Sequence, residues 1–431
     1  MLYDNLSVNE KGQLTIGGLD AADLADRFGA PLYVLDEDRV RANCRTYVKA
    51  LADHMPAGSY PLFAGKALCF KGLYPVLESE GMGADVVSPG EIFTALAGGF
   101  PAERLYFHGN NKTDEDIAYA LESGVGTFIV DNHNELDTLD RLAGAFGKKQ
   151  KVLLRVTPGI DPHTLQAINT GRIDCQFGVP IETGQAARFA AAAVEKENLD
   201  VLGFHSHIGS QIFEAEPFCD AVDILLAFAQ KMREDLGFTV RVLNLGGGFG
   251  VRYQESDPVV DIAGNIQKLS EHLKNGCAAL GYPVPQVLLE PGRSIVADAC
   301  VTLYRAGGVK TIEGYRSYVT VDGGMTDNPR YALYRSPYTV LPAGRMNEKA
   351  DFLCTVAGRC CESGDLIQEN VMLPEPRRDD LIAVLTTGAY NFSMASNYNR
   401  LCRPALVMVK DGEARLAVRR QTFEDLTACD L

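Results

Sequence analysis

Reactive and charged residues follow short apolar runs at several points of the chain. Lys66 ends one such run, His205 and His207 end a second, and Glu290 ends a third. A lysine amine that is shielded from water has a lowered pKa and can condense with an aldehyde. A buried carboxylate needs a partner, which a protonated ring nitrogen can supply. These residue types favour covalent chemistry on an aldehyde that carries a basic ring.

Two glycine-rich turns follow apolar runs, one after a further run and one after the run that ends in Glu290. Gly246, Gly247 and Gly248 come after Val-Leu-Asn-Leu, and Gly292 with Arg293 comes after Glu-Pro. Glycine has no Cβ atom, so such turns let the backbone approach a phosphate and present its N–H groups. The spacing is not that of a dinucleotide fingerprint. The turns therefore predict a phosphate site of another kind.

An amine, a phosphate cradle and a buried carboxylate are together what pyridoxal phosphate requires of a protein. Lys66 would bind its aldehyde, Glu290 would face its ring nitrogen, and Ser210 is placed to donate to its phosphate. The alternative is a zinc site, because His205 and His207 lie two apart and would share one face of a strand. No further ligands are spaced to complete such a site, so we predict no metal.

Composition excludes several classes of partner. The chain has 431 residues, 46% of them hydrophobic, and a formal net charge of −15. It can bury a large core, and its acidity argues against nucleic acid or an anionic membrane as a partner. No apolar run approaches the roughly 20 residues of a membrane span, and no signal peptide is visible. The 11 cysteines form no Cys-x-x-Cys pair, which favours a reduced, cytoplasmic protein.

Strand and helix patterns alternate between residues 60 and 300. About eight such units over this length predict a (β/α)₈ barrel of the TIM type, which we assign to residues 32–300. The ends of parallel barrel strands converge on one site, and phosphate is commonly bound by the loops after strands seven and eight. The expected strands are 61–67, 83–88, 104–108, 126–131, 151–157, 201–207, 240–245 and 286–290. The expected helices include 90–97, 114–123, 134–146, 184–196, 217–236 and 262–280.

The pattern changes after residue 300. Short runs with alternating polarity, separated by turn residues, predict an antiparallel β-barrel or sandwich domain over residues 301–431. The first residues contain a hairpin signal at 14–18 and are expected to join this second domain as residues 1–31. The expected strands are 301–304, 317–321, 352–357, 381–385 and 405–410.

Taken together, the motifs resemble those of the fold-type III pyridoxal-phosphate decarboxylases, whose barrel is similar to that of alanine racemase. The resemblance runs from about residue 31 to about residue 404. It rests on these segments: GKA around Lys66, GADVVSPGE, the Asp161-Pro162-His163 to Thr170-Gly171 loop, HSHIGSQ, NLGGG, EPGR, DGGM with NPR and LY, CESGD, and GAY.

The resemblance implies roles for the cofactor-side residues. Lys66 would be the residue bonded to the cofactor, and the histidine at position 207 would stack on the pyridine ring. Glu290 would face the ring nitrogen. The remaining residues implied to contact the cofactor are Ser210, Gly247, Gly248, Gly292, Arg293 and Tyr390.

The resemblance also implies a substrate side. A proton donor, Cys361, would come from the partner subunit, so that a homodimer shares its active sites. The residues implied to bind the far end of the substrate are Arg293, Arg330, Tyr334, Glu362 and Tyr390. A substrate with two ammonium and two carboxylate groups needs arginines and an acid to recognise that end.

The implied activity is decarboxylation of meso-2,6-diaminopimelate to L-lysine and CO₂, the last step of lysine biosynthesis. The nearest alternative is a related decarboxylase that acts on D-ornithine, D-lysine or carboxynorspermidine. A catalytically inactive relative that only binds partners is a second alternative, and intact Lys66, Glu290 and Cys361 argue against it.

Overall fold

A computed structural model describes residues 1–160 and 174–431. They form two compact units. Unit 1 comprises Met1–Ala42, Val251–Pro258 and Arg293–Leu431, and unit 2 comprises Asn43–Gly250 and Val259–Gly292. The domain limits proposed from the sequence, 32–300 and 1–31 with 301–431, remain a prediction.

Unit 2 is built on a closed barrel of parallel strands. The ring runs β5–β6–β7–β8–β9–β11–β12–β13, and β13 pairs with β5 to close it. This confirms the predicted (β/α)₈ barrel. The strands are β5 (Tyr60–Ala64), β6 (Gly83–Val86), β7 (Leu105–Phe107), β8 (Thr127–Val130), β9 (Gln150–Thr157), β11 (Leu199–His205), β12 (Val242–Asn244) and β13 (Gln286–Leu289), and the two-residue β10 (Val179–Pro180) pairs with β9.

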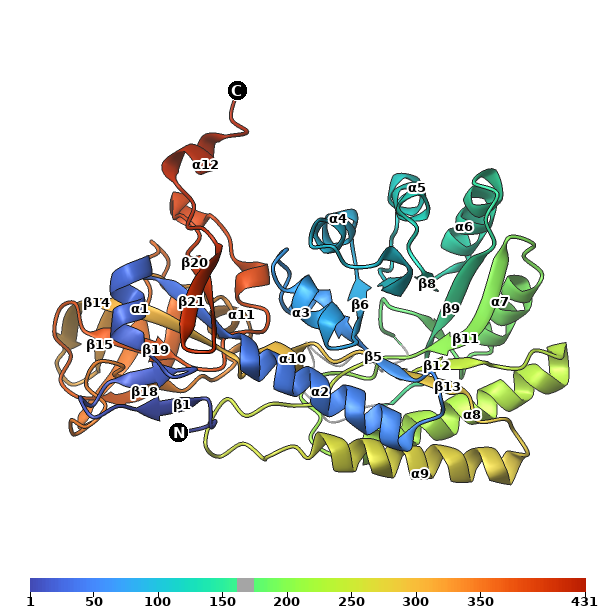
Figure 1. Cartoon of the computed structure of the whole chain (residues 1–431), viewed down its shortest axis with the longest axis horizontal. Helices are drawn as coiled ribbons and strands as arrows, with labels where there is room; N and C mark the ends of the chain where they lie inside the picture. The colour runs from blue at the N-terminus through green and yellow to red at the C-terminus, as the bar shows by residue number, and fades with distance from the viewer. Residues whose placement is uncertain (161–173) are drawn as a thin grey trace. The chain divides into compact units, whose positions relative to one another are not determined.

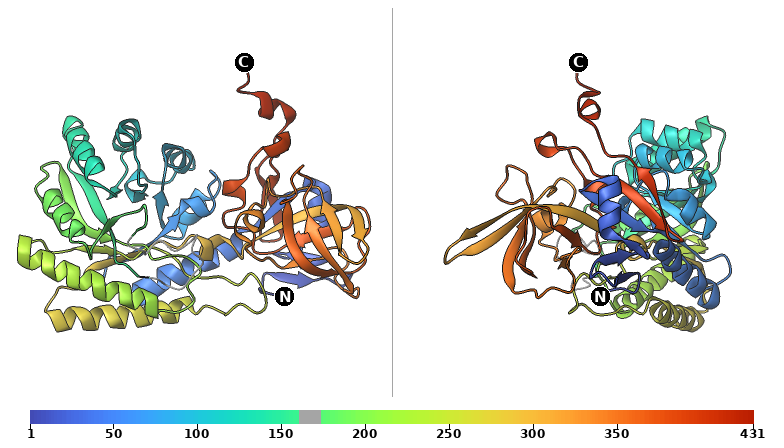
Figure 2. Two further views of the ribbon diagram at one scale, coloured as in Figure 1. Left: turned by 180° about the vertical axis from the view of Figure 1, so that it is seen from behind. Right: turned by 60° about the vertical axis from the view of Figure 1, so that its left-hand side comes forward.

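Helices cover the outside of these strands (Figure 1). Seen from behind, α8 and α9 run side by side (Figure 2). Helix α2 contains the boundary between the two units, and the others follow the strands in turn. The bounds are α2 (Glu37–His54), α3 (Tyr74–Ser79), α4 (Pro89–Ala97), α5 (Asp114–Ser123), α6 (His133–Ala145), α7 (Gln185–Val194), α8 (Glu216–Leu236) and α9 (Ile262–Leu280).

Local sequence explains where the helices of the barrel begin. The Ser88 side chain accepts a hydrogen bond from the backbone N–H of Glu91 and caps α4, which has Pro89 in its first turn. Thr113 and Asp116 form a reciprocal capping box at the start of α5. Each cap ends a βα loop shortly after a strand, so the residues of that loop are held close to the strand end.

The barrel interior is filled by side chains from alternate strand positions. Leu62, Tyr106, Ile129, Leu153, Val242 and Leu288 form one buried cluster. The inward-facing residues pack in layers, as expected for a barrel of this size. The packed interior leaves the carboxyl ends of the strands as the place for polar chemistry.

Unit 1 contains a mixed β-sheet rather than an antiparallel one. The pairings β15–β17 and β4–β20 are parallel, which corrects the predicted antiparallel domain. Alternating polarity reports which face of a strand is buried but not the direction of its neighbour, so the sequence could not reveal this. The strands are β4 (Leu32–Asp36), β14 (Cys300–Ile312), β15 (Arg316–Val321), β16 (Val340–Leu341), β17 (Phe352–Ala357), β18 (Leu366–Leu373), β19 (Leu381–Val384), β20 (Ala405–Lys410) and β21 (Glu413–Val418).

The N-terminal residues belong to unit 1. Strands β1 (Leu6–Val8), β2 (Leu14–Ile16) and β3 (Leu19–Asp20) form a small sheet, and the Leu14 N–H donates to the carbonyl of Ala343. Leu14 and Ile16 are buried in the core of this unit together with Val301 and Val407. The helices of unit 1 are α1 (Ala21–Phe28), α10 (Arg293–Val296), α11 (Arg330–Tyr334) and α12 (Phe423–Thr427).

None of the helices within residues 1–160 and 174–431 is long and apolar enough to cross a membrane.

Candidate active site

Lys66 lies two residues beyond the end of β5, in a single 3₁₀ turn over Gly65–Ala67. Its neighbours Gly65 and Ala67 are buried, whereas Lys66 itself is exposed. No described residue forms a hydrogen bond or ion pair with its ammonium group, although its charge acts on Asp85, Glu91 and His207. The strand end therefore presents an accessible amine rather than the shielded one expected from the sequence, and the bond of this amine to an aldehyde stays a prediction.

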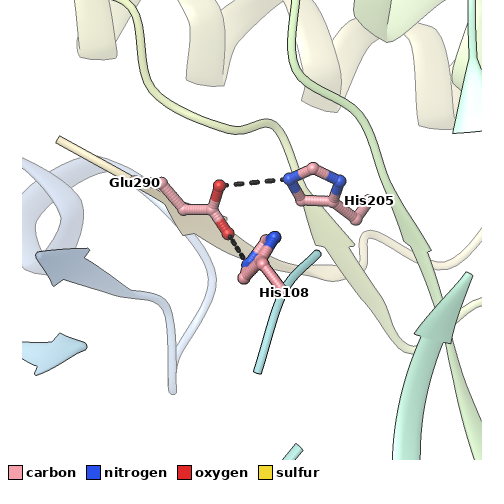
Figure 3. Close-up of side chains that lie close together, drawn as sticks. All are labelled: His108, His205 and Glu290. Atoms are coloured by element: carbon pink, nitrogen blue, oxygen red, sulfur yellow. Dashed lines mark hydrogen bonds and ion pairs between the residues drawn. The ribbon is translucent and has the colours of Figure 1, made fainter. Parts of the chain in front are cut away.

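Glu290 follows the last residue of β13 and is 6% exposed. Its Oε1 accepts a hydrogen bond of 2.6 Å from Asn244 and lies 2.9 Å from Nε2 of His108, and its Oε2 lies 3.1 Å from Nε2 of His205 (Figure 3). Burial acts to raise the pKa of this carboxyl group, but the two histidines outweigh burial and hold the pKa well below its ordinary value. Glu290 is therefore an ionised carboxylate inside the barrel.

The glycine turn after β12 has no room for side chains. A Cβ atom on Gly247 would lie 2.0 Å from the carbonyl oxygen of Glu290, and Gly246 and Gly248 have φ angles of +68° and +129°. Gly292 is equally constrained, because its Cβ would lie 2.9 Å from that of Ala64. Only glycine satisfies these positions, which leaves bare backbone along the turn. This is the arrangement predicted for a phosphate cradle.

His207 lies just past the end of β11 and against the glycine turn. A Cβ atom on Gly246 would come within 2.8 Å of its Nδ1. Burial and the nearby charge of Lys66 hold the pKa of His207 well below its ordinary value, so the ring is neutral at pH 7. A neutral, half-buried imidazole beside Lys66 is suited to stacking on a flat ring.

A second group of predicted residues comes together in unit 1. Arg293 and Arg330 are both about 95% buried and donate to the same acceptor, the hydroxyl oxygen of Tyr253, over 2.7 Å and 2.9 Å. Both guanidinium groups also lie over the ring of Tyr390, at 4.9 Å and 5.6 Å from its centroid. Within the described residues no carboxylate lies within ion-pair distance of Arg330. The pair forms a cationic surface that could bind an anionic group.

Three predicted residues lie outside this cationic group. Tyr334 shares α11 with Arg330, but its side chain is 40% exposed. Cys361 and Glu362 are exposed in the loop between β17 and β18, where the backbone N–H of Cys361 donates to Asn399 over 2.7 Å. The Asp161–Gly171 loop, which the resemblance includes, lies outside the described residues.

Three residues at these sites were missed from the sequence. Asn244 ends β12 and His108 directly follows β7, so the rule that found Lys66 and Glu290 would have found both had it been applied to every polar strand end. Tyr253 lies in the segment Val251–Pro258, which has no secondary structure, and no sequence signal marks it. Its role depends on the placement of two arginines that are far away in the chain.

Comparison with known proteins identifies the family. A family model described as "Pyridoxal-dependent decarboxylase, pyridoxal binding domain" matches residues 37–297, which is more than half of the chain. The chain belongs to the pyridoxal-dependent decarboxylase family. Its cofactor is pyridoxal phosphate, and the residues fit that group: an accessible lysine, a glycine turn without room for Cβ atoms, and an ionised carboxylate occupy the strand ends.

Individual members of the family match over the full length of this chain. A protein of Bacillus subtilis named diaminopimelate decarboxylase is 44% identical over 432 residues, covering 100% of this chain and 98% of the relative. A protein of the same name from Synechocystis is 42% identical and covers 98% of this chain and 91% of the relative.

Solved structures of the decarboxylase family share the fold. Diaminopimelate decarboxylase from M. jannaschii in complex with L-lysine superimposes with a TM-score of 0.91 at 31% identity, over 99% of this chain and 98% of the other. A lysine/ornithine decarboxylase from Vibrio vulnificus, in complex with putrescine, has a TM-score of 0.76 at 25% identity, over 90% and 97% of the two chains.

Proposed function

We propose that this protein removes one carboxyl group of meso-2,6-diaminopimelate as CO₂ and leaves L-lysine, the last step of lysine biosynthesis. The observation that supports this substrate most strongly is the buried pair Arg293 and Arg330, which donate to one tyrosine oxygen. Such a pair suits a substrate whose far end bears a carboxylate. The full-length similarity to proteins named for this substrate supports the same reading.

On the cofactor side, the Lys66 amine would bind the aldehyde carbon, and the turn Gly246–Gly248, with Ser210 and Gly292, would hold the phosphate. His207 would stack on the ring, and the ionised Glu290 would keep a proton on the ring nitrogen. When bound, pyridoxal phosphate supplies the electron sink for the electron pair that departing CO₂ leaves behind.

On the substrate side, Arg293 and Arg330 would bind the distal carboxylate, and Tyr390 would contact both substrate and cofactor. Tyr334 and Glu362 would bind the remaining polar groups of that end, including its ammonium. Glu362 is exposed in a single chain, so this role requires that another surface cover it.

Reprotonation of the carbon that loses CO₂ would come from Cys361 of the partner subunit. The exposed position of Cys361 and Glu362 in one chain supports a homodimer in which each subunit completes the site of the other. We place the reaction in the cytoplasm, since the composition and the free cysteines fit a reducing compartment.

The alternative substrates D-ornithine, D-lysine and carboxynorspermidine are distinguished by one test. Purified protein with added pyridoxal phosphate is incubated with each compound, and CO₂ release and the amine product are measured. We expect the kcat/KM of meso-diaminopimelate to exceed that of D-lysine and D-ornithine by roughly 10⁴-fold, because these two compounds lack the distal carboxylate that would balance the charge of the buried arginines. A higher kcat/KM for any of the three alternatives would reject the proposed substrate.

The covalent link to Lys66 is tested separately from the substrate. Borohydride reduction of the coloured protein followed by peptide mapping should label Lys66, and the Lys66→Ala variant should lose the visible absorbance of the bound cofactor. A label on another lysine would remove Lys66 from its role and leave the family assignment intact.

A further inference from the structure

The Glu290 carboxylate is contacted by nitrogen atoms from three other strand ends. Asn244 ends β12, His205 ends β11 and His108 follows β7. Figure 3 shows the two histidine rings approaching different oxygens of the carboxylate. Strands β7 and β13 are separated by β5 and β6 in the barrel, so His108 reaches Glu290 across the barrel interior.

His205 is neutral and carries its hydrogen on Nε2. It is 1% exposed, and burial lowers its pKa to about 4 despite the neighbouring Glu290. In the described residues its Nδ1 has no hydrogen-bond partner, whereas Nε2 faces Glu290 at 3.1 Å. A hydrogen on Nδ1 would be a buried donor without an acceptor, so the Nε2–H tautomer is favoured.

His108 stands between two carboxyl groups. Its Nε2 lies 2.9 Å from Oε1 of Glu290 and 3.8 Å from Oδ1 of Asp85, and its ring meets that of His205 edge to face at 4.9 Å. A lone pair on Nε2 would face two acceptor groups and be repelled by both. We therefore assign the hydrogen to Nε2, which is close enough to attract the carboxylate electrostatically, although in the described residues its direction does not meet the geometry of a hydrogen bond with Glu290.

Asn244 connects the carboxylate to the glycine turn. Its Oδ1 accepts the backbone N–H of Gly246 over 3.0 Å, so its amide nitrogen must face Glu290, which it contacts over 2.6 Å. The backbone N–H of Glu290 in turn donates to the carbonyl of Gly246 over 2.8 Å. The position of the carboxylate is thus coupled to that of the turn predicted to hold phosphate.

We propose that His108 and His205 are positioning residues that hold the Glu290 carboxylate in one orientation, as an anion, for the ring nitrogen of the cofactor. The inference deepens the proposed role of Glu290 and rests on it. Neutral His205 donates to the carboxylate without cancelling its charge, so the full negative charge stays available to a protonated ring. Because both carboxylate oxygens are already held in place, cofactor binding does not have to order them, and the entropy cost of doing so is avoided.

The same atoms also satisfy the geometry of a divalent metal site. One ligand atom each from His108, His205 and Glu290 lie within 4.8 Å of one another, the one such group of three among the described residues. Hydrogen bonding and metal ligation require opposite states of the histidine Nε2 atoms. Metal analysis of the purified holoenzyme, and a zinc titration of the protein after cofactor removal, therefore decide between them; stoichiometric zinc at this group would overturn the proposal.

Paired substitutions test the positioning role. His108→Phe and His205→Phe remove the N–H and keep a ring, whereas His108→Gln and His205→Gln keep an amide N–H of similar reach. We expect the Phe variants to bind pyridoxal phosphate roughly 10- to 100-fold more weakly, the effect of losing a hydrogen bond to a charged group. The kcat should fall by a similar factor while the substrate KM changes little, and the Gln variants should recover most of both. His272→Phe is the control, because His272 lies on α9 and pairs with Asp223 at the surface.

A second measurement decides the case if a Phe variant fails to fold. Nitrogen-15 NMR of histidine-labelled wild-type holoenzyme should show Nε2-protonated rings for His108 and His205, assigned through the Gln variants. Nδ1-protonated rings, or Phe variants with wild-type cofactor affinity, would overturn the proposal. The affinity for pyridoxal phosphate and the tautomers of His108 and His205 are both measured without substrate. If the protein turned out not to decarboxylate diaminopimelate, these two measurements would still test the positioning role.

Discussion

At the scale of single residues, the site depends on groups whose ordinary behaviour is altered by burial. Glu290 stays ionised inside the barrel only because N–H groups surround it, and His207 stays neutral because burial and Lys66 oppose its protonation. The glycines of the turn matter because they have no Cβ atom, which leaves their backbone accessible. Replacing any of these residues changes local energies more than it changes the fold.

Gly247→Ala should destabilise the protein and weaken cofactor binding. The added Cβ would lie 2.0 Å from the carbonyl oxygen of Glu290, and a backbone atom cannot move aside as a flexible side chain can. We expect a loss of about 1–3 kcal/mol in the free energy of unfolding, the usual cost of overpacking, together with a higher Kd for pyridoxal phosphate. Urea unfolding and cofactor titration measure the two effects.

Gly90→Ala is the matched control for that substitution. Gly90 lies in the first turn of α4. The atom nearest to a Cβ added at this position would be Ser88 Oγ at 3.7 Å, which is an ordinary contact. Alanine is the better helix former, so this variant should be as stable as the wild type or slightly more so. Equal losses in both variants would contradict the argument from close approach.

At the scale of elements, the barrel strands fix where each reactive group stands, and the loops after them need their own support. The loop after β7 carries His108 and is held by Lys112, whose ammonium donates to the carbonyls of Gly109 and Ile129 and to Glu135 over 2.7–2.9 Å. The side chains of Lys112 and Glu135 are each 2% exposed. The buried ion pair thus connects this loop to β8 and α6.

Lys112→Met should lower the free energy of unfolding by about 3–5 kcal/mol, because it leaves the Glu135 carboxylate buried and uncompensated. Adding Glu135→Gln should recover much of the loss, since the glutamine can still accept from the backbone N–H of Asp131. The exposed pair Arg141 and Asp114 is the control, and Arg141→Met should cost no more than about 1 kcal/mol. Chemical denaturation measures all of these, and equal costs at the two pairs would refute the assignment.

Unit 1 contains a carboxyl group whose burial makes stability depend on pH. Burial raises the pKa of Asp327 to about 7, against an ordinary value of 3.8, even though the Tyr304 hydroxyl and the Gly324 N–H donate to it. The folded protein therefore binds a proton between pH 4 and 7 that the unfolded chain has released. Raising the pH through this window must lower the free energy of unfolding.

Asp327→Asn should remove that part of the pH dependence. Relative to the variant, the wild type should lose stability from pH 4 to pH 7 by a few kcal/mol, at about 1.4 kcal/mol for each unit of pKa shift. Below pH 4 the difference between the two proteins should be constant. Unfolding free energies measured at fixed protein concentration from pH 4 to 8 test this, and parallel curves across the window would show that Asp327 is ionised at its ordinary pKa.

At the scale of the whole molecule, the proposed reaction needs more than one chain. Lys66 and Cys361 have complementary proposed roles, and Cys361 would serve the site of the partner subunit. Lys66→Ala and Cys361→Ala should each be nearly inactive as homodimers. Mixing them under conditions that exchange subunits should restore about a quarter of the wild-type activity, because half of the dimers are mixed and each has one intact site.

The control for that mixture is the double variant Lys66→Ala with Cys361→Ala, mixed with wild type. A mixed dimer then has one defect in each site, so it should show no activity of its own. Recovery to about a quarter in the first mixture, together with a fall in the second from about half to about a quarter of the wild-type activity, which its wild-type dimers alone supply, would establish shared sites. Absence of recovery after proven subunit exchange would place Cys361 in the site of its own chain or outside the mechanism.

The barrel, its strand ends and the residue types that occupy them are encoded locally along the chain. Alternating β and α patterns, helix caps such as Ser88 and Thr113, and the glycines after β12 are local signals, because each depends on neighbours within a few residues. The positions of Lys66 and Glu290 after strands are local signals of the same kind, and their proposed roles follow from their combination with the glycine turns rather than from either residue alone.

Which distant groups act on one another is a property of the folded chain alone. The two histidines around Glu290, the tyrosine oxygen shared by Arg293 and Arg330, and the parallel pairing of β15 with β17 join segments far apart in the chain. Hydrogen bonds and pKa shifts act over a few ångströms in space, and one sequence does not record those distances. That is why no sequence signal marks Tyr253, although it contacts both arginines on which the proposed substrate binding depends.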